Sequence, residues 1–312
     1  MISFGADRAP ELLADPGLVP PPAAPGPPGG LAWLRAGVAR FASGEAHARR
    51  RALAADLLGP MDLDVLRLRA EILACIALED APLDVMDRIA RDVPVRVLAE
   101  ALDAPGIDPA AVRTIAAAYP AGDAAPGTDE AVAALVAAFG GVPDEPTAAR
   151  IGLLVQACEA TAALIGGTLA AGAGLSPDAI AARLRDDPPV SATFRTATIR
   201  TATTGTAAVS TAATAVAGLA PGEAVRIELD GAVPFGAGPH ACPGRPQALA
   251  IATGVCEALQ RVPPPAGPSR TNRSRTCASP RRSVWKHHRG NATVSRPPWK
   301  NHAEKITLRK PP

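Results

Sequence analysis

The longest apolar segment of the 312-residue chain constrains its fold most strongly. It covers residues 147–174 and reads TAARIGLLVQACEATAALIGGTLAAGAG. Large apolar residues recur in it three and four positions apart, which is the spacing of one helix face. The remaining positions are mostly Ala and Gly, so the helix is apolar almost all round, as in helices that lie inside a protein. The sequence therefore predicts a long helix that crosses the middle of a folded body.

The composition indicates that this body is mostly helical. Hydrophobic residues make up 47% of the chain but aromatic residues only 3%, so the core must consist of Ala, Leu, Val and Ile. Alanine-rich cores with few β-branched runs favour helices. We predict a mainly α fold with a small β region. The expected helical segments are 31–59, 61–78, 82–106 (two short helices broken near Pro94), 129–141 and 176–190, and strands are expected in the Thr- and Val-rich segment 191–230.

Charge and proline content divide the chain into three regions: a Pro/Gly-rich flexible lead (1–30), a body (31–261) and a basic tail (262–312). The tail holds twelve Lys and Arg but one acid, so it carries +11 and the rest of the chain −9. Clustered cations attract nucleic acid non-specifically, but the composition favours a disordered extension that buries too little apolar surface to fold. We therefore expect no nucleic-acid partner.

The five cysteines are scattered and odd in number, which argues for a reducing compartment and against a disulfide framework. We see no signal peptide, and no uninterrupted apolar run approaches the roughly 18 residues of a membrane span. The expected location is cytoplasmic, with no membrane association.

A glycine-rich loop with one cysteine precedes an alanine-rich helical segment, in the stretch VPFGAGPHACPGRPQALAIA (233–252). Glycines allow a positive φ and a close approach of the backbone to a ligand. A thiolate is stabilised at a helix N-terminus, and a proline such as Pro243 suits the first helical turn. The alternative is a buried structural cysteine beside a glycine turn.

The spacing of this loop resembles the haem-ligand signature of the cytochrome P450 family, F-x-x-G-x-x-x-C-x-G. The matching residues are Phe235, Gly238, Cys242 and Gly244, with His240 and Pro243 between them. The resemblance implies haem b as cofactor, with its iron ligated by Cys242, with Phe235, Gly238 and Gly244 around it and with His240 among the residues that bind its propionates. A thiolate ligand donates electron density to the iron.

Three further segments resemble the same family in the same order. FASGEAHARRRALA (41–54) is similar to the family's early helix, which implies that His47 and Arg51 bind haem propionates. This spacing alone also fits a solvated helix face.

Arg195 occupies a position where the family often has another propionate-binding arginine. The alternative interpretation is that Arg195 is an exposed arginine on a strand. In LLVQACEATAALIGG (153–167), Glu159 and Thr161 match the family's proton-relay positions, whereas the usual threonine is Ala160. Without the resemblance, Glu159 would be an ordinary helix acid in a salt bridge.

The chain also departs from the family pattern. Ala182 replaces the glutamate of the family's E-x-x-R pair while Arg185 keeps its arginine, and an unpaired arginine there would cost several kcal/mol if buried. The usual N-terminal sheet and the segment before the cysteine loop are short or missing. Two hypotheses follow: a monooxygenase that acts on a small organic substrate with electrons from a ferredoxin and a ferredoxin reductase, or a degenerate relative that binds haem or a partner without oxygen chemistry.

Overall fold

A computed structural model describes residues 1–79, 83–172, 174–198 and 219–261, together with the backbone of 200–204, 207–211 and 307–308. The basic tail, whose disorder we predicted, lies outside the described residues except for its short strand at 307–308.

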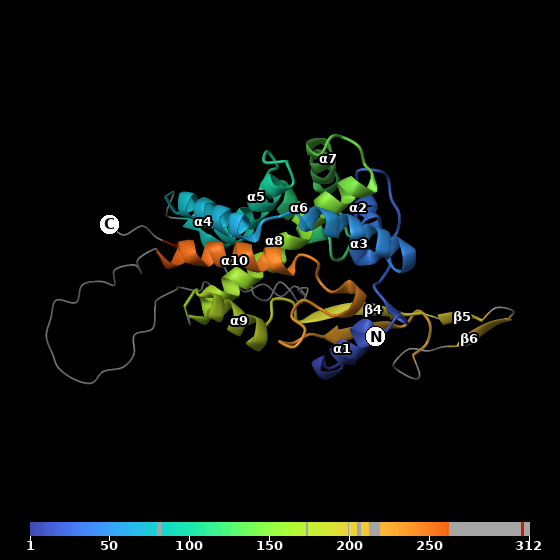
Figure 1. Ribbon diagram of the computed structural model, residues 1–312. Helices are drawn as coiled ribbons and strands as arrows, with labels where there is room; N and C mark the ends of the chain where they lie inside the picture. The colour runs from blue at the N-terminus through green and yellow to red at the C-terminus, as the bar shows by residue number, and fades with distance from the viewer. Residues whose placement is uncertain are drawn as a thin grey trace, which may run out of the picture.

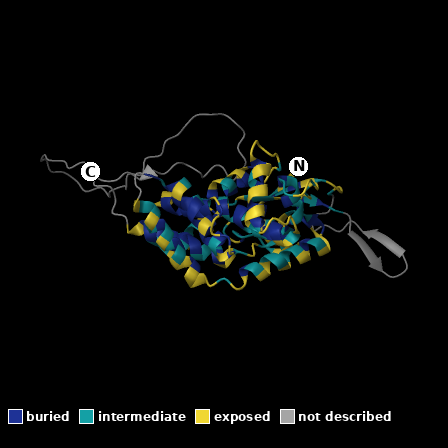
Figure 2. Ribbon diagram, turned by 90° about the horizontal axis from the view of Figure 1, so that it is seen from above, coloured by how far each residue is buried: buried dark blue, intermediate teal, exposed yellow. Residues whose placement is uncertain are grey.

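The long central helix is present as predicted. Helix α8 (Glu145–Ala171) begins where the Asp144 carboxylate accepts a hydrogen bond from the Thr147 N–H (2.8 Å) and ends at Gly172, whose φ is +66°. Ile151, Leu154 and Ile165 on it are fully buried. Figure 1 shows α8 running through the middle of the helical part, and Figure 2 shows buried residues concentrated inside the folded body. The helices around it are α2 (Leu31–Gly37), α3 (Gly44–Leu58), α4 (Leu63–Glu79), α5 (Asp92–Ala101), α6 (Pro109–Ala118), α7 (Thr128–Ala138), α9 (Pro177–Asp186) and α10 (Arg245–Gln260).

Several helix boundaries differ from the predictions. The segment 31–59 forms two helices, because Val38 and Ala42 are extended on either side of a 3₁₀ turn (Ala39–Phe41). Pro94 does not break a helix: it lies in the first turn of α5, where a proline's missing N–H costs little, after a π-helical turn (Met86–Arg91). Helix α6, which the sequence analysis missed, is capped by the Asp108 carboxylate.

The small β region is a four-stranded sheet in the order β1-β7-β4-β2. Strand β1 (Ile2–Phe4) pairs parallel with β7 (Ala224–Glu228), and β4 (Ala192–Ala197) pairs antiparallel with β7 and with β2 (Leu18–Val19). A hairpin of β5 (Arg200–Thr204) and β6 (Ala207–Thr211) follows β4, and β3 (Leu83–Asp84) pairs with β8 (Thr307–Leu308). The mainly α fold with a small β region is confirmed.

The N-terminal residues differ from the expected flexible lead. Besides β1 and β2, they form helix α1 (Ala9–Ala14), which lies against the sheet in Figure 1. Leu12 is fully buried in a second apolar cluster with Val225 and Ile227 of β7. Burial of these leucines stabilises the N-terminal segment, so the folded region begins at about residue 2 rather than at residue 31. Within the first 30 residues, the longest stretch without helix or strand is 20–30, which is rich in proline.

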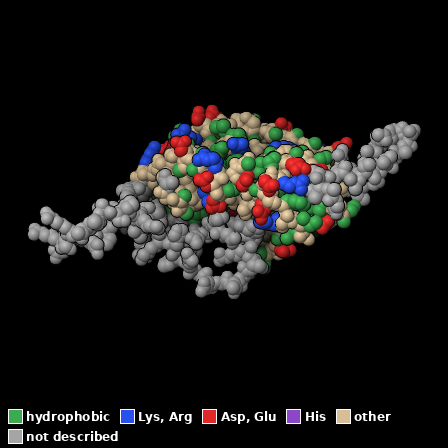
Figure 3. All heavy atoms as spheres, turned by 90° about the horizontal axis from the view of Figure 1, so that it is seen from below, with side chains coloured by type: hydrophobic (Ala, Val, Ile, Leu, Met, Phe, Trp, Pro, Cys, Tyr) green, Lys and Arg blue, Asp and Glu red, His purple; other side chains and the backbone are tan. Residues whose placement is uncertain are grey.

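Two features are relevant to the location of the protein: the mixture of side chains on its surface and the burial of the central helix α8. On the face shown in Figure 3, acidic and basic side chains are interspersed with apolar ones. By length and apolar composition α8 could cross a membrane, but 67% of its most apolar stretch is buried inside the protein. The helix therefore has the burial of a core helix.

Candidate functional site

The cysteine loop connects β7 to α10 and is held closed by its own backbone. The Cys242 N–H donates to the Phe235 carbonyl (2.9 Å), and the Gly236 N–H donates to the Val233 carbonyl (2.9 Å). Gly236 and Gly238 have φ values of +72° and +65°, which favour glycine. A Cβ at Gly238 would lie 2.5 Å from the Leu13 carbonyl oxygen, so this glycine also lets α1 pack against the loop.

Cys242 lies outside the two apolar clusters of the protein. Its side chain is exposed, whereas Cys158 and Cys256 are buried, so the alternative of a buried structural cysteine is wrong. Desolvation by the surrounding protein nevertheless raises the pKa of the Cys242 thiol, while the Gly244 N–H, Arg51 and Arg40 oppose this shift. Because desolvation dominates, a further positive charge such as a metal ion is needed to hold the thiolate.

The helix after the loop begins slightly later than predicted. Gly244 is the N-cap of α10, Pro246 lies in its first turn, and Pro243 precedes the helix. Phe235 packs at the edge of the main apolar core, and the Arg245 guanidinium lies over its ring (5.3 Å to the centroid).

Four residues that the sequence analysis assigned to propionate binding lie together beside the loop: His47, Arg51, Arg195 and His240, here called the cationic cluster. The His47 and His240 rings are 3.9 Å apart between centroids. The Arg51 Nη1 donates to the Ala241 carbonyl (2.7 Å) and so links α3 to the cysteine loop. Arg195 is only 7% exposed, so the alternative of an exposed strand arginine is wrong.

The cationic cluster suppresses the charge of its own members. Desolvation and the neighbouring charges of His47, Arg195 and Arg51 lower the pKa of His240 to about 3. Desolvation and Arg51 lower the pKa of His47. Burial, with a smaller effect from Arg40, lowers the pKa of Arg195 to about 10. Both imidazoles are therefore neutral at pH 7, while Arg195 stays charged.

The cationic cluster has the chemistry of an anion site. The buried His47 Nε2 and Arg195 Nε have no hydrogen-bond partner within the described part of the chain. Among the described residues, no carboxylate forms an ion pair with any member of the cluster. Buried donors without acceptors are costly, and a carboxylate-bearing ligand would satisfy them. The residues present thus fit the propionates of a haem, and Cys242 would be the residue to ligate its iron.

The two predicted proton-relay residues are not brought together. The Glu159 carboxylate accepts a hydrogen bond from the Arg91 Nε (2.9 Å), whose Nη1 donates to Asp87 (2.7 Å). Thr161 is 3% exposed. Two residues on a helix are about 200° apart around its axis, so these side chains lie on opposite faces of α8. Glu159 thus makes a salt bridge, as expected for an ordinary acidic residue on a helix. Ala160, between Glu159 and Thr161, is exposed.

The arginine at the position of the family's E-x-x-R pair does not incur the free-energy cost of burying an unpaired charge. Arg185 is exposed, so no unpaired charge is buried there. The buried arginine of α9 is Arg183, which packs beside Gly167 of α8 and pairs with Asp187. Sequence spacing alone gave no signal for this residue.

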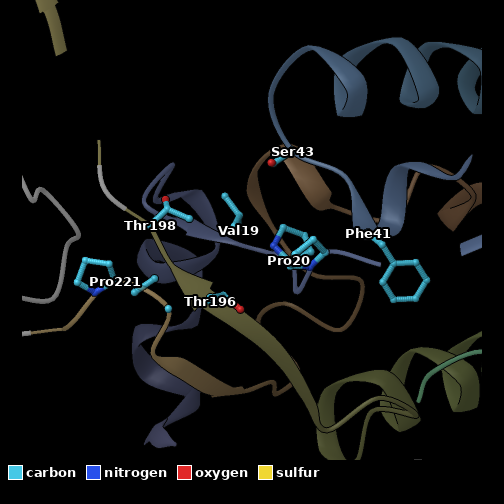
Figure 4. Close-up of a pocket in the computed structure, with 10 residues that line it drawn as sticks. Val19, Pro20, Phe41, Ser43, Thr196, Thr198 and Pro221 are labelled. Carbon is cyan, nitrogen blue, oxygen red and sulfur yellow. The ribbon is translucent and has the colours of Figure 1, made fainter. Parts of the chain in front are cut away.

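A cavity of about 480 Å³ opens near the cationic cluster, between the sheet and the turn before α3 (Figure 4). Phe41 and Ser43 line it on one side, and Thr196, the neighbour of Arg195 on β4, on another. The remaining lining residues are Val19, Pro20, Pro22, Ala197, Thr198, Pro221 and Gly222. The sequence analysis did not identify this cavity.

Solved structures define the fold class. The structure of P450BioI in complex with hexadec-9Z-enoic acid ligated acyl carrier protein is 17% identical, with 82% of each chain covered and a TM-score of 0.61. Ligand-free CYP164A2 of Mycobacterium smegmatis is 19% identical, with 83% of each chain covered and a TM-score of 0.56. CYP109E1 of Bacillus megaterium in complex with corticosterone is 18% identical, with 82% of each chain covered and a TM-score of 0.53.

These likenesses establish a cytochrome P450-like fold, as the sequence resemblance predicted. No protein-family model matches the sequence, and the search of curated proteins gives no match.

Proposed function

We propose that the chain is a haem-thiolate protein of bacterial cytochrome P450 type, shortened and partly degenerate, that inserts one oxygen atom of O₂ into a small organic substrate. The observation that supports this most is the exposed cysteine of a P450-like loop beside a partly buried cluster of two histidines and two arginines, which among the described residues has no acidic partner. The fold supports the same proposal.

In this proposal Cys242 is the axial iron ligand of haem b, and His47, Arg51, Arg195 and His240 bind the propionates. Phe235, Gly238 and Gly244 shape the loop around the sulfur. Bound haem with a thiolate ligand supplies the binding and reductive activation of O₂. The Gly244 N–H stabilises the thiolate, and the carbonyl of Ala241, held by Arg51, fixes the loop against α3. Glu159 and Thr161 are the candidates to deliver protons, each from its own face of α8.

The electrons would come from a ferredoxin and a ferredoxin reductase. We further propose that the protein works in the cytoplasm without membrane or nucleic-acid partners, and that the haem domain ends at residue 261. The burial of α8 supports a protein that does not use this helix as a membrane anchor.

A second candidate function is haem binding without monooxygenation. Ala160 offers no hydroxyl where the family carries threonine, and Glu159 is held by Arg91 on a different helix face from Thr161. Proton delivery needs donors within hydrogen-bond reach of one another. These observations favour a protein that keeps the cofactor but has lost efficient oxygen activation.

The test is the ferrous–CO spectrum of full-length protein expressed with haem available. We expect the strongly red-shifted Soret band of a thiolate complex, its loss in Cys242→Ala, and its retention in the control Cys75→Ala. A well-folded protein that takes up no haem, or a Soret band unaffected by Cys242→Ala, would refute the proposal. If the thiolate band is present but NADPH oxidation with added ferredoxin and reductase yields no oxygenated product across a substrate panel, the second candidate holds.

A further inference from the structure

The face of α4 that points away from the core is apolar. Its large apolar residues are 39–61% exposed and recur three and four positions apart: Val65, Leu68, Ile72 and Ile76. Positions at this spacing lie on one side of a helix, so the four side chains form a continuous row, here called the α4 stripe. The opposite side of α4 packs into the main core and against α10. A row of exposed apolar residues of this kind marks an interaction surface.

Acidic side chains lie at both ends of the α4 stripe. Asp62 and Asp64 are exposed at its N-terminal end and Glu79 at its C-terminal end. None of the three forms an ion pair with a described residue. The two arginines of α4, by contrast, pair with glutamates of α10 and α5. The chemistry that fits this surface is therefore an apolar segment that carries basic residues.

A second copy of the chain does not have this chemistry at α4. If two α4 helices packed in parallel around a two-fold axis, each acid would face its own counterpart. If they packed antiparallel, Asp62 and Asp64 of each copy would lie beside Glu79 of the other. Like charges that face each other across an interface are unfavourable, so the acids disfavour both arrangements.

The segment 262–306 begins and ends beside α4. Arg261, directly before it, forms an ion pair with Glu71, which is three residues after Leu68 and so flanks the stripe. Figure 1 shows α10, which leads into this segment, running beside α4. At the other end, β8 pairs antiparallel with β3, and β3 begins four positions after the last residue of α4. The structure thus brings both ends of the segment to the helix that carries the stripe.

The length and composition of the segment also fit the stripe. Its 45 residues reach at most about 150 Å when extended, whereas the 17-residue helix α4 is about 26 Å long. Two motifs in it join a tryptophan to basic residues: SVWKHHRG (283–290), with Trp285, and SRPPWKNH (295–302), with Trp299. Tryptophan is a frequent anchor in interfaces, and the cations match the acids at the ends of the stripe.

We propose that the basic tail docks on the α4 stripe of its own chain, with Trp285 and Trp299 packed on the apolar row and their neighbouring cations beside the acids at its two ends. This inference goes beyond the proposed function and does not depend on haem. The rest of the tail keeps the disorder that its composition predicts.

The test is tryptophan fluorescence of the full-length chain with Trp33→Phe, which removes the one tryptophan outside the tail. We expect emission at a shorter wavelength than that of the same chain unfolded in urea, and weaker quenching by acrylamide, because the docked indoles leave water. Leu68→Asp puts a charge in the stripe and should shift both values towards those of the unfolded chain. Val142→Asp is the matched control, since Val142 is 57% exposed and Leu68 56%, and it should change neither value.

A second variant guards against a change in the fold of α4. Glu79→Lys reverses a charge at the end of the stripe without changing its apolar residues, and a cation near a helix C-terminus does not weaken the helix. It should also shift the emission towards that of the unfolded chain, with an unchanged far-UV circular dichroism spectrum. All variants are compared at equal haem content, so the failure of the haem proposal would leave this result unaffected.

Emission equal to that of the unfolded chain, or a shorter-wavelength emission that Leu68→Asp leaves unchanged, would overturn the inference. If the shift appears only as the protein concentration is raised, the stripe joins two copies and the inference is wrong. If it appears only when vesicles of anionic phosphatidylglycerol are added, the tail binds a lipid surface and the inference is again wrong.

Discussion

Gly238→Ala tests whether α1 holds the cysteine loop in place. The substitution forces a left-handed backbone on an alanine, which costs about 1–2 kcal/mol. The new methyl would also lie 2.5 Å from the Leu13 carbonyl oxygen and 2.9 Å from the Ala14 Cα. Moving α1 away from this contact costs a further 1–3 kcal/mol or so. We therefore expect a loss of about 2–5 kcal/mol in the free energy of unfolding.

Gly236→Ala is the matched control, because Gly236 has a similar φ (+72°) but a Cβ there would meet its nearest atoms only at 3.9 Å. It should lose only the backbone cost, about 1–2 kcal/mol. Urea unfolding measures both values, and the reaction rate of Cys242 with a thiol reagent reports whether the loop has loosened. Equal losses in the two variants would refute the packing of α1 on the loop and restore the flexible lead that the sequence suggested.

Two further stability predictions concern polar groups elsewhere. Hydrogen bonds from Arg49 and Arg50 lower the pKa of Glu145 from 4.5 to about 2, so its stabilising effect is full above pH 4.5 and is lost as the pH falls towards 2. Glu145→Gln should therefore lose about 1–2 kcal/mol at pH 7, allowing for the solvent exposure of Arg49, and almost nothing near pH 2; a difference independent of pH in urea unfolding would contradict this. The buried Tyr119 hydroxyl has no hydrogen-bond partner among the described residues, and desolvation raises its pKa. Tyr119→Phe should be neutral or stabilise the protein by up to about 1 kcal/mol; a thermal or urea midpoint clearly below wild type would show that the hydroxyl has a partner.

Features that depend on local pattern were predictable from the sequence. The burial of α8 follows from apolar residues at helical spacing, and the N-cap of α9 from Ser176, whose Oγ accepts the Ala179 N–H. The cysteine loop was found because its glycines and cysteine keep a fixed spacing.

Features that depend on distant partners were not predictable. Leu12 and Leu13 lie in a short segment between prolines, and their burial requires β7, which is more than 200 residues away in the sequence. Arg40 matches no sequence pattern, and only the fold brings it near Cys242 and the cavity. Whether Arg183 or Arg185 is buried depends on how α9 is rotated against α8, which the gap at Gly167 decides.

The pairing of β1 with β7 has a consequence for biosynthesis. Ile2 is synthesised more than 200 residues before its partner Val225, which follows only after most of the helical body has been made. Contacts between such distant residues form late in folding, so the nascent N-terminus stays without its sheet partner while the helices assemble. The cysteine loop, which follows β7 directly, can close against α1 only in the last stage. Closure of the loop around Cys242 against α1 therefore requires that β7 has already been synthesised.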